Sequence, residues 1–210
     1  MSRRTPLPPP PPPAHLRSWP DRAALLADRA GVLAYLGGRS LGPAALVAFW
    51  ALVLGVQFGW GLVGGVLVSF ANGSDDPISV MIAMPVLAVG LGALITAGVF
   101  LGLSVRKERT MRGLMSQWAA LDSDPEGDAR LRMAGRSLSW LLTSFAVGAT
   151  GLWIAFVVPA TAERGEDTYM EVAYAMGAGT VLWIAGLIGV ARAVGHYRWA
   201  VRLVVPAAAR

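Results

Sequence analysis

The chain has 210 residues, of which 55% are hydrophobic and only 15% are charged. Soluble globular domains have about 25% charged residues, so this composition excludes an ordinary soluble domain. The chain contains no cysteine, which excludes disulfides, thiolate metal sites and cysteine nucleophiles. Lysine and arginine total 18 residues and all but one are arginine, an imbalance typical of GC-rich coding that indicates a bacterial protein.

The amino-terminal region carries a run of six prolines at positions 8–13. We expect residues 1–20 to form a Pro-rich, disordered cytoplasmic tail, although such a run can also dock in the groove of a partner. Asp21 can cap a following amphipathic helix over 21–38, which would end at the two glycines that begin with Gly37. This helix is expected to lie on the cytoplasmic leaflet, with binding of a soluble partner as the alternative.

Four stretches without a formal charge follow, of 35, 29, 26 and 20 residues. A hydrocarbon layer of about 30 Å needs roughly 20 apolar residues in a helix, so each stretch can cross a bilayer. The alternating pattern of a barrel strand is missing. The sequence therefore predicts an all-α fold, a four-helix transmembrane bundle of two helical hairpins. The spans are expected at residues 44–68, 78–103, 138–158 and 172–191.

A basic cytoplasmic loop is predicted at residues 104–136, between the second and third spans. Its apolar residues recur at helical spacing, which predicts a second amphipathic helix at the membrane surface. Lipid contact would satisfy this face, and docking of a protein partner is the alternative. The residues expected to make these contacts are Arg109, Met111, Arg112, Met115 and Trp118.

Basic residues concentrate on one side of the predicted spans. Residues 1–42, the 104–136 loop and the tail at 192–210 together hold 17 of the 18, and Arg164 is the exception. The positive-inside rule therefore places both termini and the middle loop in the cytoplasm. The spans are expected to cross the inner or plasma membrane of the cell. The two sides carry net charges of +10 and −5, so orientation explains the high pI and nucleic acid is not an expected partner. Anionic lipid headgroups are expected on the basic side.

The acidic run that starts at Asp122 resembles the first half of a calcium loop. Its second half lacks the required ligands, because Arg130 and Met133 occupy the ninth and twelfth positions. A capping box of Ser123 and Glu126, opening a helix into the third span, is the preferred interpretation. No other metal, cofactor or catalytic pattern is present, so we expect none of these sites and no enzyme activity.

No formal charge lies inside any span, and Gln57 is the strongest polar residue there. It would either line a pore or make a hydrogen bond between helices, which is the commoner use of such a residue. Small residues four positions apart predict close helix packing in the bundle and on a face that could form a homo-oligomer. Such pairs are Gly55 and Gly59, Gly61 and Gly65, Ala88 and Gly92, Gly98 and Gly102, Ala175 and Gly179, and Ala185 and Gly189.

A tripeptide Arg-Ser-Leu opens each predicted hairpin, at Arg39 and again at Arg136. Two parallel repeats are one interpretation, and a chance match of three residues is the alternative. Taken together, the sequence predicts a non-catalytic membrane subunit or scaffold whose cytoplasmic elements meet a membrane partner or anionic lipid. A small oligomeric channel or permease, with Gln57 on its path, is the alternative.

Overall fold

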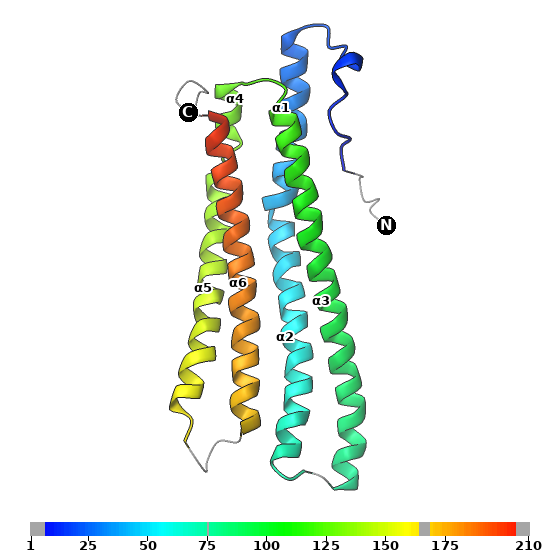
Figure 1. Cartoon of the computed structure of the whole chain (residues 1–210), viewed down its shortest axis with the longest axis vertical. Coiled ribbons are helices and arrows are strands. Elements are labelled where there is room, and N and C mark those ends of the chain that lie inside the picture. The colour runs from blue at the N-terminus through cyan, green and yellow to red at the C-terminus, as the bar shows by residue number, and fades with distance from the viewer. Residues whose placement is uncertain (1–6, 75, 164–168, 205–210) are drawn as a thin grey trace.

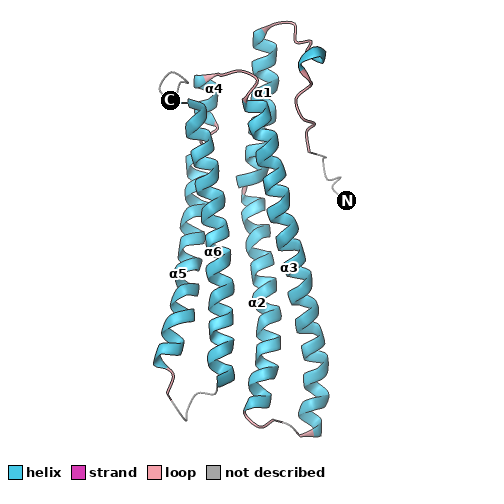
Figure 2. Ribbon diagram, in the orientation of Figure 1, coloured by secondary structure: helices cyan, strands magenta, loops and turns pink. Residues whose placement is uncertain are grey.

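The computed structural model describes residues 7–74, 76–163 and 169–204, and within them every regular element is a helix (Figure 2). The all-α prediction is therefore confirmed. The elements are a short 3-10 helix, Ala14–Leu16, and six α-helices: α1 (Arg22–Leu41), α2 (Pro43–Ala71), α3 (Pro77–Ala119), α4 (Pro125–Arg130), α5 (Ala134–Thr161) and α6 (Tyr169–Val204).

Two long antiparallel hairpins, α2 with α3 and α5 with α6, make up the bundle, and α2 packs on α6 to join them (Figure 1). Each of the four long helical segments is long and apolar enough to cross a membrane. Their outer faces expose large apolar side chains such as Phe58, Ile95 and Phe145, which water would solvate poorly. The chain is thus a multi-pass membrane protein with the predicted four-helix architecture.

The second span and the expected surface helix of the middle loop form one continuous helix, α3, of 43 residues. No proline or glycine interrupts the chain between Leu103 and Met111, and Glu108 pairs with Arg112 one turn later. At 1.5 Å per residue, α3 is about 64 Å long, roughly twice the thickness of a bilayer core. Its last turns therefore project beyond the apolar region instead of lying across the end of the bundle.

The first helix also differs from its expected position, because α1 follows the bundle axis beside the end of α3 (Figure 1). Asp21 is its N-cap, as predicted, and accepts a hydrogen bond from the Ala24 amide. The helix continues past Gly37 to Leu41 and ends only at Gly42. Pro43 explains this end, because a proline disfavours helical geometry in the residue before it, and Gly42 has an extended ψ of 158°.

A short helix and a turn connect α3 to α5. Asp124, rather than the expected Ser123, caps α4 by accepting a hydrogen bond from the Gly127 amide at 3.2 Å. The helix stops at Arg130, and α5 starts only after Met133, whose φ of 41° is left-handed. The expected helix from this turn into the third span is therefore broken. Met133 is not a residue that favours this conformation, so the sequence did not signal the break.

Candidate functional site

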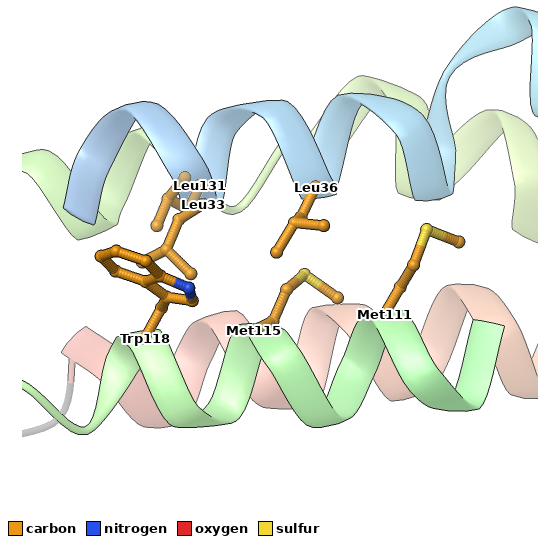
Figure 3. Packing of buried hydrophobic residues seen from close by; sticks show 6 residues of the cluster. All are labelled: Leu33, Leu36, Met111, Met115, Trp118 and Leu131. Carbon is orange, nitrogen blue, oxygen red and sulfur yellow. The ribbon is translucent and has the colours of Figure 1, made fainter. Parts of the chain in front are cut away.

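The helix ends that project from one end of the bundle form a folded unit, which we call the platform. It consists of α1, α3 from Arg106 to Ala119, α4, and α6 from Arg192 to Leu203. A small apolar core lies between α1 and α3, with one contribution from the turn after α4 (Figure 3). The core residues are Leu33, Leu36, Met111, Met115, Trp118 and Leu131.

Three of the expected contact residues lie in this core. Met111, Met115 and Trp118 are only 3%, 2% and 4% exposed, and they point toward α1 (Figure 3). Their apolar contacts are therefore made within the chain rather than with lipid or a partner. The helical spacing identified the apolar face correctly, but α1 carries a matching face, and burial of two such faces against each other removes both from water.

The Pro-rich segment covers the edge of the same core. The indole Nε1 of Trp118 donates a hydrogen bond to the Pro9 carbonyl at 3.1 Å, and Arg17 donates to the Pro12 carbonyl at 3.2 Å. Leu7 and Trp19 pack against the core residues. The described part of this segment is thus folded back on the platform, whereas the sequence predicts a disordered tail. Residues 1–6 of that predicted tail lie outside the described residues.

A buried ion pair joins α1 to α4. The two terminal nitrogens of Arg29 donate to the two carboxylate oxygens of Asp128, at 2.7 and 3.0 Å. The side chains are 2% and 1% exposed. A bidentate pair of this kind fixes the relative orientation of the two groups, since both hydrogen bonds depend on it. Sequence reasoning missed the pair, because the two residues are 99 positions apart and each occurs within an ordinary polar stretch.

Glu108 is the centre of a second buried polar cluster, where α1, α3 and α6 meet. Its Oε1 accepts a hydrogen bond from the Ser40 hydroxyl at 2.7 Å, and its Oε2 lies 2.6 Å from Arg192 Nη2. The same nitrogen donates to the Ser40 carbonyl at 2.8 Å, and the guanidinium lies 4.6 Å from the Trp140 ring centre. These contacts balance the buried charges at the base of the platform, next to the apolar bundle.

The two expected basic contact residues have different environments. Arg112 is part of the Glu108 cluster: its Nε lies 3.3 Å from the carboxylate, and its Nη2 donates to the Arg192 carbonyl at 3.4 Å. Arg109, by contrast, is exposed on α3. Of the five residues expected to contact lipid or a partner, Arg109 alone is exposed and the other four are buried or partly buried, so for Arg109 the expected contact stays a prediction.

An exposed ion pair ties the start of α1 to the end of α3. Arg22 Nε lies 2.7 Å from Asp122 Oδ2. The hydrogen bond from Arg22, followed by that from the Ser123 amide, lowers the pKa of Asp122 to about 2. The pair therefore favours the folded state above the ordinary carboxyl pKa of about 4, and this contribution is lost as the pH falls toward 2. Water screens the pair, so the platform depends more on its buried contacts.

Gln57 lies within the bundle, where α2 packs on α6. Its amide Nε2 donates a hydrogen bond to the Ala178 carbonyl at 2.9 Å, and the side chain is partly buried. A second bond between the same helices runs from Trp60 Nε1 to the Tyr174 carbonyl at 3.0 Å. Gln57 thus has the interhelical contact that was one of its two predicted uses.

We expect Gln57→Leu to lower the free energy of unfolding in detergent by about 0.6–2 kcal/mol, the range for hydrogen bonds between membrane helices. The Ala178 carbonyl remains within its own helix, so the variant leaves no isolated polar group. Unfolding in mixed micelles measures the change. If Gln57→Leu instead alters ion or solute flux in reconstituted vesicles, the residue lines a path and the channel hypothesis gains support.

Metal-ligating residues do not converge in the described ranges: no group of three or more His, Asp or Glu side chains there is arranged to hold a metal ion. The acidic run at Asp122–Asp128 is used in other ways. Asp122 pairs with Arg22, Asp124 caps α4 and Asp128 pairs with Arg29.

Comparison with known proteins yields no relative: no family model matches the chain, and neither does any curated protein or solved structure.

Proposed function

We propose that this protein is a non-catalytic subunit or scaffold of a bacterial inner membrane, with both termini and the platform in the cytoplasm. The observation that carries the proposal is the internal pairing of the platform's buried charges. Arg29 and Asp128 neutralise each other, as do Glu108 and Arg192, so these groups serve the fold. What remains at the surface is a preformed basic face suited to a membrane partner or to anionic lipid headgroups.

The exposed side chains at this end support the orientation. Those of α3, α4, the turn after α4, α5 and α6 include Arg106, Lys107, Arg109, Arg130, Arg132, Arg136, Arg198 and Arg202. Cytoplasmic segments next to spans carry such an excess of arginine and lysine. The apolar core and the buried ion pairs hold the platform as one folded unit. A preformed surface loses little conformational entropy when it binds, which supports a scaffold role.

Photo-crosslinking in cells tests the scaffold proposal. A photoreactive residue at Gly113 or Gln117, both exposed on the projecting part of α3, should give an adduct of discrete mass, or adducts with anionic lipid. The matched control is Gly98, which is exposed on the same helix within its apolar part and should give neither protein adduct nor preference for anionic lipid. No adduct from either platform position, together with no affinity of the purified protein for anionic vesicles, would contradict the proposal.

A further inference from the structure

A groove opens at the boundary between the apolar bundle and the platform, where α1 ends and α2 begins. Its volume is about 380 Å³. Its walls come from the α1–α2 junction, from α3 and from α6, and they include Arg39, Lys107 and Arg192. The remaining lining residues are small or apolar, and none is acidic.

The three basic side chains of the groove have different environments. Arg192 is 8% exposed and is held from behind by Glu108, and its Nε has no hydrogen-bond partner. Arg39 donates from Nη1 to the Tyr35 hydroxyl at 2.5 Å, which orients it along α1. Lys107 is exposed on α3. Arg39, Lys107 and Arg192 therefore line one concave surface, and the charge of Arg192 is balanced there by Glu108.

The start of α2 and the end of α1 both line the groove. Gly42, Pro43 and Ala44 form part of its lining, and they are the N-cap and first two residues of a 29-residue helix. The N-terminus of a helix favours an anion through its unpaired amide groups and its dipole. The last turn of α1, with Gly38 and Arg39, lines the same groove and has the opposite polarity, so the groove owes its positive charge to the side chains.

The level of the groove in the bundle indicates the kind of anion. Ala45 and Ala48 line it on the bundle side, next to Val47, which is exposed on the apolar outer surface. Ser104 lines it on α3, two residues before the first charged residue, Arg106. A ligand in the groove would thus have its charged part among cations and its remainder beside exposed apolar side chains. An anionic phospholipid has this arrangement, whereas a soluble phosphate would use only the charged part.

We propose that this groove is a binding site for the phosphate headgroup of an anionic glycerophospholipid of the cytoplasmic leaflet. Arg39 and Lys107 contact the phosphate from opposite sides, Arg192, already paired with Glu108, forms part of the groove wall, and an acyl chain runs along the exposed surface of α2. The site rests on the proposed orientation and names the lipid class that the proposed scaffold contacts.

Titration of the purified full-length protein with phosphatidylglycerol or phosphatidylcholine in detergent micelles, followed by thermal unfolding, tests the site. The wild-type protein should be stabilised by phosphatidylglycerol and not by phosphatidylcholine. The double variant Arg39→Gln/Lys107→Gln should bind phosphatidylglycerol roughly 30-fold more weakly, given the usual contribution of each basic residue near anionic headgroups. The matched control, Arg132→Gln/Arg198→Gln, removes the same charge from exposed positions of the basic surface outside the groove, and it should weaken binding much less than the groove variant does.

If both double variants weaken phosphatidylglycerol binding equally, general charge attraction explains the binding and the proposed site is wrong. Wild-type protein without a preference for phosphatidylglycerol would overturn it too. Inorganic phosphate at matched ionic strength is the third arm, and stabilisation equal to that by the lipid would show a free-phosphate site and contradict the lipid assignment. If the lipid titration contradicts the site, photo-adducts with protein at Gly113 or Gln117 in Arg39→Gln/Lys107→Gln would still support the scaffold proposal. The two proposals can therefore fail separately.

Discussion

Arg29→Met should lower the free energy of unfolding by about 3–5 kcal/mol, the largest loss expected from a single polar residue in this chain. The substitution leaves the Asp128 carboxylate buried without its bidentate partner. An isolated buried charge is costly, and α1 or α4 must move to let water reach it. Unfolding in detergent gives the total loss, and hydrogen exchange of the α1 amides shows where the structure opens.

Two further variants separate this effect from a general sensitivity of the platform. The double variant Arg29→Met/Asp128→Leu removes both charges and should recover much of the stability, because apolar pairs often replace buried ion pairs without loss. Arg22→Gln breaks the exposed pair with Asp122 and should change stability little. If Arg29→Met is no more harmful than Arg22→Gln, the ion pair does not hold α1 against α4.

Gly186→Ala should be among the most damaging small substitutions in the bundle. An added Cβ would lie 2.5 Å from the Gly148 Cα and 2.8 Å from the Ser144 carbonyl oxygen, both in the backbone of α5. A backbone cannot rotate away as a side chain does, so α5 and α6 must separate. We expect a loss of about 1–3 kcal/mol from this overpacking, and a larger loss for Gly186→Leu, measured by unfolding in mixed micelles.

Gly98→Ala is the matched control, because an added Cβ there meets nothing within 4 Å. Alanine favours a helix over glycine by about 1 kcal/mol, so this variant should be neutral or slightly more stable. Equal destabilisation by Gly98→Ala and Gly186→Ala would mean that the α5–α6 approach is not the cause.

Hydropathy and charge predicted the number of spans, and the structure has them, because crossing a membrane imposes length and composition on a segment directly. The spacing of small residues was a weaker guide. It identified Gly59 and Gly179, where an added Cβ would lie 2.6 Å from a backbone nitrogen of the neighbouring helix. It also selected Gly98 and Gly102, where an added Cβ would meet nothing within 4 Å. Spacing places residues on one face of a helix but does not say which face meets a neighbour.

The sequence predicted the helices of the platform and their apolar faces, but not how these helices pack together. The apolar faces of α1 and of the end of α3 were both identified, yet each was expected to meet the membrane surface. A sequence shows that a face needs burial and does not show which surface buries it. The Arg29–Asp128 pair and the cluster around Glu108 join residues from 68 to 152 positions apart. Such contacts depend on the arrangement of whole helices and leave no local pattern.

We propose that four spans carry the platform on the cytoplasmic side of the membrane. The chain contains no cysteine, so single cysteines can report on each side without background. Ala71→Cys, at the end of α2 opposite the platform, and Ala120→Cys, just after α3, both replace exposed alanines. With a membrane-impermeant maleimide on bacterial spheroplasts, we predict labelling of Ala71→Cys at once and of Ala120→Cys only after permeabilisation. Labelling of Ala120→Cys in intact spheroplasts, with Ala71→Cys protected, would contradict the account.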